Sequence, residues 1–415
     1  MNRDLPPEAA AAHRLLSAAA VRERAHQLLD QGLAGRLEHF TVHPDRLGGC
    51  ADEVVTTIKA AYPDLDVPFH ARWRHFTAGG LDRWETVSSL AAFDSEPAMA
   101  RAAFDLAIIS VLLDAGAGPA WRYEEGRTGE TYSRSEGLAV ASFDMFIGGS
   151  FSNHPEDPFR VDGEALASLT ADELAAGFQV SAENPLVGLE ARAALLRRLG
   201  QVVAGAPEVF GREDDPRPGG LFDVIAATAR SGRIVTPAVL GALLEHLGPI
   251  WPSRITLGGV DLGDTWRHPL AHADDASDGL VPFHKLSQWL AYSLLEPLSW
   301  TGFTIEEVDG LTGLPEYRNG GLFLDTGVLA LRDPQDAARS HTVDSQLVVE
   351  WRALTVALLD RVADLVRERL GLSAADFPLA KVLEGGTWAT GRRLARERRA
   401  DGSPPLSIVS DGTVF

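Results

Sequence analysis

The stretch VPFHKLSQWLAYSLLEPL, residues 281–298, decides how the fold of this chain is interpreted. Leu286, Leu290 and Leu294 recur every four residues, and this spacing predicts a helix with one apolar face against a core. Beside that face runs a second stripe of cationic, amide and aromatic side chains: Lys285, Gln288, Trp289 and Tyr292. A helix that only packs needs a single apolar face. The second stripe therefore indicates a pocket for a polar, anionic small molecule.

A Gly-rich acidic segment follows, LPEYRNGGLFLDTG, residues 314–327, which carries Glu316, Arg318 and Asp325. Two carboxylates near a cation such as Lys285 suit chemistry at an anomeric carbon, where a carboxylate stabilises an oxocarbenium-like centre or activates water. A Lys–Glu pair and an aspartate in a turn explain the same residue types equally well. The residues alone leave both interpretations open.

Helical patterns dominate the rest of the chain. Residues 7–35 predict one or two helices, and residues 95–113 predict another with a proline in its first turn. The longest predicted helix spans residues 344–370 and ends at Gly371, a residue that favours the left-handed conformation of a helix terminus. Two Thr–Glu pairs have the spacing of a capping box: Thr170 with Glu173, and Thr304 with Glu307.

Strand signals are few. Short apolar runs bounded by glycines predict two small β-hairpins, one from residues 253–257 with 260–262 and one from residues 322–324 with 328–331. The sequence has neither an alternation of strands with helices nor an internal repeat. We therefore predict a mainly α-helical protein, a single large domain over residues 1–415 with small β-hairpins.

The composition excludes several functional classes. A formal net charge of −20 argues against a nucleic-acid partner, because phosphates require a basic surface. It argues equally against binding to an anionic membrane. Cys50 is the one cysteine, so an intramolecular disulfide and a cysteine-based zinc site are both excluded. The first residues lack the apolar core of a signal peptide, and we expect a cytoplasmic location.

Metal and cofactor signatures are also weak. Asp264 and His268 are four residues apart and would share one face if their segment were helical, which is the spacing of a metal-binding pair. The sequence contains no HExxH motif, no phosphate-binding P-loop and no dinucleotide-binding glycine pattern. We predict no metal ion and no cofactor.

A basic cluster stands out in this acidic chain: HARWRHFTAGGLDRWE, residues 70–85. Arg74, His75 and Arg83 surround two glycines, and arginine binds phosphate through two parallel hydrogen bonds. We interpret the cluster as an anion clamp. The alternative is a solvated basic loop with Trp73 and Trp84 in the core.

At these residues the chain resembles a known family, the uracil-catabolism protein family, formerly a domain of unknown function. The resemblance runs over nearly the whole chain and rests on long blocks: HARWRHFTAGGLDRW, LLDAGAGPAWRY, RSEGLAVASFDMF, PSRITLGGVDLGDTW and VPFHKLSQWLAYSLLEPL. The family implies a pathway in which uracil becomes its ribonucleotide, the ring is opened and urea is released. This member would act on a ring-opened, urea-bearing ribotide.

Three blocks, VPFHKLSQWLAYSLLEPL, PEYRNGGL and VVEWRALTVALLD, are distantly similar to those of the queuosine-salvage nucleotide N-glycosidases. Those enzymes have an all-α fold like that of DNA glycosylases and hydrolyse the N-glycosidic bond of a nucleoside 5′-monophosphate. The similarity places their lysine on Lys285 and their catalytic aspartate on Glu316. It places their acidic-x-Arg pair on Glu350 and Arg352. Glutamate in place of aspartate lengthens the catalytic side chain by one methylene group.

Together these observations predict a hydrolase, an N-glycosidase that cleaves the N-ribosidic bond of a uracil-derived ribose 5-phosphate compound. Glu316 would act at C1′, with Asp325 as the alternative carboxylate. The predicted phosphate and substrate contacts are Arg74, His75, Arg83, Lys285, Trp289, Tyr292, Arg318, Glu350 and Arg352. The alternatives are an amidohydrolase or isomerase acting on the ring-opened nucleotide, and a non-enzymatic scaffold or binding subunit that associates with other uracil-catabolism enzymes.

Overall fold

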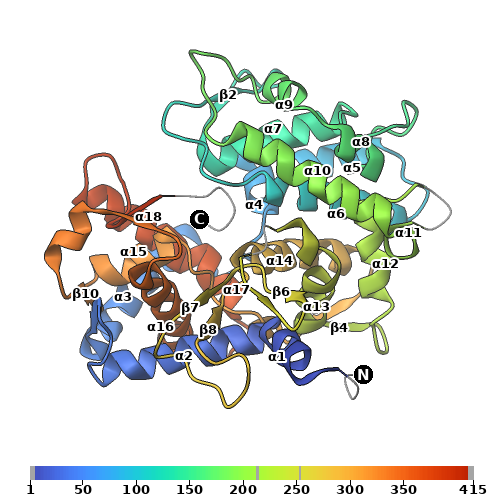
Figure 1. Ribbon diagram of the computed structural model, residues 1–415. Helices are drawn as coiled ribbons and strands as arrows, with labels where there is room; N and C mark the ends of the chain where they lie inside the picture. Colours follow the sequence, from blue (N-terminus) through green and yellow to red (C-terminus); the bar gives the residue numbers. More distant parts are fainter. Residues whose placement is uncertain (1–4, 212–214, 252–253, 410–415) are drawn as a thin grey trace. The chain divides into compact units, whose positions relative to one another are not determined.

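The computed structural model describes residues 5–211, 215–251 and 254–409, and these fold into two compact units. The first unit is built from the described residues in 1–70, 253–288 and 307–415, and the second from those in 71–252 and 289–306. Both units consist mainly of α-helices, so the predicted fold class is confirmed (Figure 1). The single domain over residues 1–415 and the likeness to DNA glycosylases stay predictions.

In the first unit, α16 (Gln346–Leu370) packs against α2 (Ala18–Leu33) and α3 (Leu47–Ala61). The side chain of Ser345 caps α16 by accepting a hydrogen bond from the Val348 N–H, and Gly371 ends it at φ 69°. The remaining helices of this unit are α1 (Pro7–Leu15), α15 (Tyr317–Asp325), α17 (Leu379–Val382), α18 (Trp388–Arg398), the π-helix η7 (Leu383–Thr387) and the 3-10 turns η1 (Pro44–Arg46), η5 (Val308–Gly310) and η6 (Pro334–Ala338).

Four short strand pairs complete the first unit within the described residues. They are β1 (Phe40–Val42) with β10 (Leu329–Leu331), β5 (Thr256–Leu257) with β6 (Val260–Asp261), β7 (Thr265–Arg267) with β8 (Leu280–Pro282), and β11 (Ser340–Thr342) with β12 (Ser407–Val409). The first three pairs are antiparallel and the last is parallel.

In the second unit, α6 (Glu96–Leu112) is buried along most of its length, and α10 (Leu189–Gly205) packs closely on α8 (Gly163–Ser168). The other helical segments are α4 (Trp73–Phe76), η2 (Ala78–Gly80), α5 (Arg83–Leu90), α7 (Arg134–Ile147), α9 (Ala171–Gly177), α11 (Pro207–Phe210), η3 (Pro218–Gly220), α12 (Leu221–Ala226), α13 (Thr236–His246) and η4 (Gly248–Ile250). The strand pairs are β2 (Tyr123–Glu124) with β3 (Thr131–Tyr132) and β4 (Arg233–Val235) with β9 (Thr304–Glu306). Helix α14 (Lys285–Trp300) contributes its first four residues to the first unit and the rest to the second.

Two local predictions are confirmed and two are wrong. The β5–β6 hairpin lies where one was predicted, although residue 253 is outside the described residues, and Thr170 forms its capping box with Glu173. Residues 322–324 instead belong to α15, and β10 pairs with β1. Thr304 begins strand β9 and not a helix. Short apolar runs do not distinguish strand from helix by periodicity, so the tertiary partner decides.

Every helix in the described residues is too short or too polar to cross a bilayer.

Candidate active site

Glu316 lies at the N-terminus of α15 as its capping residue. Its Oε2 accepts a hydrogen bond from the Arg318 backbone N–H at 2.7 Å, and its Oε1 accepts one from the Asn319 N–H at 2.6 Å. Both donors point out of the first turn of the helix, where the helix dipole favours negative charge. The backbone therefore fixes the carboxylate, which remains half-buried and partly accessible to solvent.

Opposing effects set the pKa of Glu316. Burial raises the pKa most strongly, whereas the two backbone hydrogen bonds and the positive charges of Lys285 and His70 lower it. The net effect is a raised pKa. The site thus brings one carboxyl group close to a lysine and a histidine, and this is a combination suited to charge stabilisation and proton transfer.

His70 is oriented by a second carboxylate. Its Nδ1 lies 2.6 Å from Oε2 of Glu384, and its backbone N–H donates to the carbonyl of Ala380 at 3.0 Å. His70 is buried, and Glu384 is partly exposed in the π-helix η7. A histidine with one ring nitrogen bound to a carboxylate is held in a defined orientation, as general acids and bases require.

The sequence interpretation missed this histidine–glutamate pair. His70 is the first residue of the basic cluster, but the anion clamp was assigned to Arg74, His75 and Arg83. A signal for Glu384 was present, because Gly385 and Gly386 follow it inside a helical pattern. Such glycines often mark a close backbone approach, and π-turns inside helices occur frequently at functional sites.

Lys285 is held at the start of α14 by Asp264, whose Oδ2 accepts the Lys285 backbone N–H at 3.0 Å. The same carboxylate binds Arg352 through two hydrogen bonds of 2.8 Å each. Burial raises the pKa of Asp264, but Arg352 and the hydrogen bonds outweigh it and lower the pKa well below its usual range. The Arg352 Cζ in turn lies 4.1 Å from the centre of the Phe283 ring. Arg352 thus supports Lys285 through Asp264.

Glu350 is a buried structural acceptor. Its oxygens accept the backbone N–H groups of Glu38 and His39, each at 3.1 Å, and its Oε1 lies 3.3 Å from Nε2 of His268. Burial raises the pKa of Glu350, but these hydrogen bonds outweigh it and lower the pKa.

The helical metal pair of Asp264 and His268 is wrong, because the segment between them is strand β7. Within the described residues, no three or more His, Cys, Asp or Glu side chains gather to hold a metal ion.

A buried amide connects α14 to the segment that leads into Glu316. Gln288 Nε2 donates to the Thr312 hydroxyl at 2.7 Å, and Gln288 Oε1 accepts the Thr312 backbone N–H at 2.8 Å. Asn319 Nδ2 then donates to the carbonyl of Leu314 at 3.1 Å. These bonds fix the distance between the start of α14, which carries Lys285, and the start of α15.

Asp325 lies at the opposite end of α15 from Glu316. A helix rises about 1.5 Å per residue, so nine residues separate the two carboxylates by roughly 13 Å along the axis. Both Asp325 oxygens bind Arg399, at 2.8 and 2.6 Å. The structure therefore does not place Glu316 and Asp325 as a pair on one glycosidic bond, for which the separation is about 5–9.5 Å. Arg318, the remaining predicted contact on α15, donates to the Gly402 carbonyl at 2.9 Å.

Apart from His70, the basic cluster belongs to the second unit. Arg83 is buried and binds Glu125 through two hydrogen bonds of 2.8 and 2.6 Å, while its Nη1 donates to carbonyl oxygens of Phe76, Ala78 and Leu81. Its role here is that of an internal counter-ion. The two tryptophans of the cluster are also buried and pack on Trp300, as the alternative interpretation of the cluster expects for Trp73 and Trp84.

Four further predicted contacts, Arg74, His75, Trp289 and Tyr292, also lie in the second unit. Arg74 Nη2 donates to Glu296 at 2.5 Å. The His75 ring meets the Trp289 ring edge-on, with 6.0 Å between centroids. Tyr292, one turn along α14 from Trp289, is fully buried.

Comparison with known proteins assigns this chain to a family. The family described as "Protein of unknown function (DUF1688)" matches residues 14–415. The chain is 40% identical over 410 residues to "Protein urg3" of Schizosaccharomyces pombe, and the aligned region covers 97% of this chain and 98% of that protein. It is 39% identical over 436 residues to "Uracil catabolism protein 4" of Lachancea kluyveri, and the aligned region covers 96% of this chain and 98% of that protein. The resemblance to uracil-catabolism proteins is thereby confirmed, and the chain belongs to the DUF1688 family.

Proposed function

We propose that this protein is an N-glycosidase of uracil catabolism, which hydrolyses the N-ribosidic bond of a uracil-derived ribose 5-phosphate compound such as ribosylurea 5′-phosphate. The name of the Lachancea kluyveri relative supports the pathway. Glu316 carries the proposed reaction type, because its carboxylate is fixed by two backbone N–H groups close to the charges of Lys285 and His70.

The proposed chemistry breaks the bond between C1′ and nitrogen, and the electron pair leaves with the nitrogen. Positive charge develops at C1′ and the ring oxygen, where the Glu316 carboxylate stabilises it. His70, oriented by Glu384, donates the proton that the leaving nitrogen takes up. Water adds its oxygen to C1′ and passes a proton to Glu316, whose raised pKa favours that transfer. The products are ribose 5-phosphate and urea.

Lys285 and the backbone N–H groups lower the pKa of Glu316 against the larger effect of burial, and so favour the ionised form that charge stabilisation requires. The assignments of Arg74, His75 and Lys285 to phosphate, and of Trp289 and Tyr292 to the wall of the base-side pocket, stay predictions. Arg83, Asp325, Glu350 and Arg352 are engaged with other protein groups, and we assign them no contact with substrate.

A product assay with the full chain tests the proposal. Ribosylurea 5′-phosphate is the substrate, and ribose 5-phosphate, urea and ammonia are quantified over time. We expect ribose 5-phosphate and urea to appear in equal amounts without ammonia. Release of ammonia would assign an amidohydrolase instead. Binding of the compound with no product would favour the non-enzymatic subunit, and either result overturns the N-glycosidase.

A further inference from the structure

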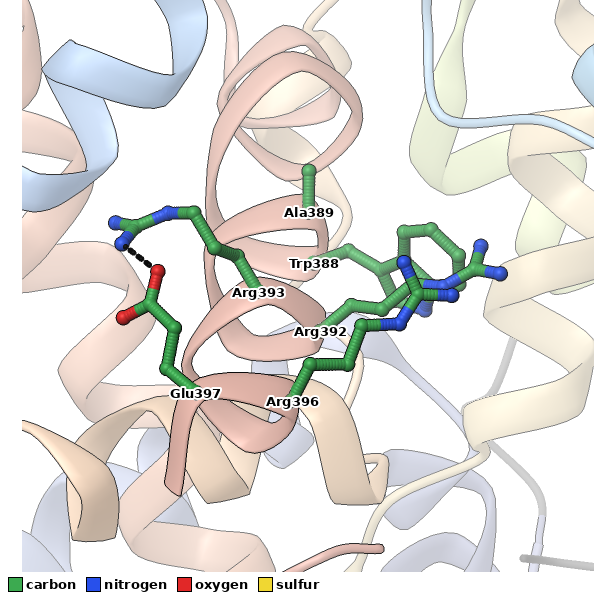
Figure 2. Close-up of a pocket in the computed structure, with 6 residues that line it drawn as sticks. All are labelled: Trp388, Ala389, Arg392, Arg393, Arg396 and Glu397. Atoms are coloured by element: carbon green, nitrogen blue, oxygen red, sulfur yellow. Dashed lines mark hydrogen bonds and ion pairs between the residues drawn. The ribbon is translucent and has the colours of Figure 1, made fainter. Parts of the chain in front are cut away.

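A cavity of about 530 Å³ opens in the first unit, where the loop of residues 271–279 meets the first turns of α2. Its lining comes from the end of α1, the first three turns of α2 and residues 272–277. A cavity of similar volume on α18 is lined by that helix alone, and there Arg393 pairs with Glu397 (Figure 2). The cavity at α2 instead has walls from separate chain segments, and such a cavity can surround a small ligand.

Hydrogen bonds hold the two walls of this cavity together. Gln27 on α2 donates from Nε2 to the His272 carbonyl at 3.2 Å, and its Oε1 accepts the His272 backbone N–H at 3.2 Å. Arg24 donates to the same carbonyl and, from Nη2, to the Ser277 hydroxyl at 3.1 Å. The walls are therefore in place before a ligand arrives, so binding does not have to order them.

Arg24 is a buried positive charge whose hydrogen bonds go to neutral groups. It is 5% exposed, and its Nη atoms donate to a carbonyl, a hydroxyl and the Gln27 amide oxygen. The nearest carboxylate in the described part of the chain is that of Glu23, which is 62% exposed and lies 3.7 Å from Nη1. The Arg24 Nε has no hydrogen-bond partner among the described residues. Because a buried charge is costly without a close partner, Arg24 favours an anion in the cavity that it lines.

The amino end of α2 adds to this positive potential. Ser17 caps the helix, and its hydroxyl accepts the Ala20 backbone N–H at 3.2 Å. The first N–H groups of a helix have no acceptor within it, and the helix dipole favours negative charge there. Ala19 and Ala20 of this first turn line the cavity, and Arg24 follows Ala20 by one turn on the same face. This side of the cavity therefore suits a carboxylate.

Carboxylates of the protein give the cavity a second, negative side. Asp274 is exposed, lines the cavity and forms no ion pair with another described residue. Its neighbour Asp275 is already neutralised, because Arg14 pairs with it and the Ser277 backbone N–H donates to its Oδ1 at 2.8 Å. With Glu23, the cavity thus presents two carboxylates to a cation. Since no three His, Cys, Asp or Glu side chains of the described residues gather to hold a metal ion, an organic ammonium group fits better.

We propose that this cavity binds a zwitterion, an amino acid whose carboxylate lies toward Arg24 and the amino end of α2 and whose ammonium group lies toward Asp274 and Glu23. The two protein carboxylates would repel a simple anion, and a simple cation would leave Arg24 without a counter-ion. Opposite charges on one small molecule complement both sides of the cavity. Glu316 does not line this cavity, so the inference stands apart from the proposed function.

Binding to the full chain tests the site without turnover. The standard L-amino acids are screened singly by thermal shift, and the one that stabilises the wild type most is titrated by isothermal titration calorimetry. Its N-acetyl derivative lacks the ammonium charge, and its amide lacks the carboxylate. A hydrogen bond to a charged group contributes about 1.5–3 kcal/mol, so each derivative should bind at least about tenfold more weakly than the parent amino acid.

The double variant Glu23→Gln/Asp274→Asn removes the two groups assigned to the ammonium. Both residues are exposed, so the variant should keep its native circular dichroism. An exposed ion pair contributes up to about 1 kcal/mol, and the loss of two should weaken binding of the amino acid roughly tenfold. Binding of the N-acetyl derivative should not weaken, because that compound has no ammonium charge to lose.

Glu8→Gln/Asp30→Asn is the matched control, since it removes the same two charges at exposed positions of α1 and α2 that do not line the cavity. Its affinity for the amino acid should stay within about twofold of wild type, because salt screens distant exposed charges. The site is overturned if no standard amino acid stabilises the wild type, or if the parent and its two derivatives bind equally well. Equal losses in the two double variants would also overturn it, because net charge alone would then explain the effect.

Discussion

At the scale of single residues, Glu316 is a helix cap to which we also assign the proposed catalytic role. Helix-capping positions favour Ser, Thr, Asp and Asn, whose short side chains reach the first N–H groups. Here a longer glutamate caps α15 with both oxygens. Each carboxylate oxygen can accept more than one hydrogen bond, so capping does not exhaust it. The cap explains where the carboxylate lies. The proposed catalytic role rests on its neighbours Lys285 and His70.

Glu316→Gln tests this at the same scale. The amide keeps size and shape but removes the negative charge that would stabilise C1′, and we expect kcat to fall at least about 10²-fold, a typical loss for general acid–base function. Binding should be largely retained. Single-turnover release of ribose 5-phosphate is the measurement, with Asp325→Asn as the control.

Asp325→Asn should leave the chemistry intact, because Arg399 already binds both Asp325 oxygens. Because the substitution removes the ion pair with Arg399, Asp325→Asn should have a lower thermal midpoint than wild type. Near-normal chemistry in Glu316→Gln with loss in Asp325→Asn would transfer the role to Asp325. Normal chemistry in both would end the carboxylate mechanism.

At the scale of elements, the π-helix η7 decides where Glu384 lies. Gly385 and Gly386 pack so tightly that added Cβ atoms would come within 2.9 Å of Val67 and 2.6 Å of Val54. Only glycine permits this approach to α3 and the segment after it. The wide turn lets the helical segment continue into α18 while Glu384 reaches His70, which lies 314 residues earlier in the sequence.

The His70–Glu384 pair predicts a loss of turnover when the imidazole loses its orientation. Glu384→Gln keeps the size of the side chain but removes the carboxylate that lies 2.6 Å from Nδ1 of His70. If His70 is the general acid, His70→Gln should lower kcat at least about 10²-fold, and Glu384→Gln should lower kcat while KM changes little. A purely structural pair would lower the thermal midpoint of Glu384→Gln and leave kcat unchanged.

At the scale of the whole molecule, many arginines serve as internal counter-ions. Arg83 with Glu125, Arg217 with Asp105 and Arg352 with Asp264 form ion pairs in which at least one partner is fully buried or nearly so. Removing one partner of a buried pair commonly costs about 3–5 kcal/mol, because the other charge is left uncompensated. These arginines are buried because each is neutralised by a carboxylate of the same protein.

Acid stability should report the Arg83–Glu125 pair. Burial raises the pKa of Glu125, but hydrogen bonds from Arg83 and Thr128 outweigh it and lower the pKa to about 2. A depressed folded-state pKa stabilises the protein above the unfolded pKa of about 4.3, and that contribution is lost as pH falls toward about 2. The free energy of unfolding of wild type, measured with urea, should therefore fall as the pH is lowered from about 5 to about 2. Those two pKa values set this window.

Glu125→Gln should be less stable than wild type at pH 7, and the difference should shrink as the pH is lowered. Glu124→Gln is the control, because Glu124 is exposed and no ion pair joins its carboxylate to another described residue. Parallel stability curves for wild type and Glu125→Gln across this range would contradict the assignment.

The sequence by itself determined the helical class, the long helix that ends at Gly371 and the capping box at Thr170, because these depend on residues within a few positions of one another. It predicted Glu316 as the catalytic carboxylate and placed it in a turn; the structure makes Glu316 a helix cap, and the catalytic role stays a prediction. Tertiary structure alone decided that Arg83 is buried against Glu125, that Asp325 is bound by Arg399, and that His70 meets Glu384. The physical reason is range: an ion pair forms where the fold brings opposite charges out of water together, and local spacing carries no record of partners 42, 74 or 314 residues away.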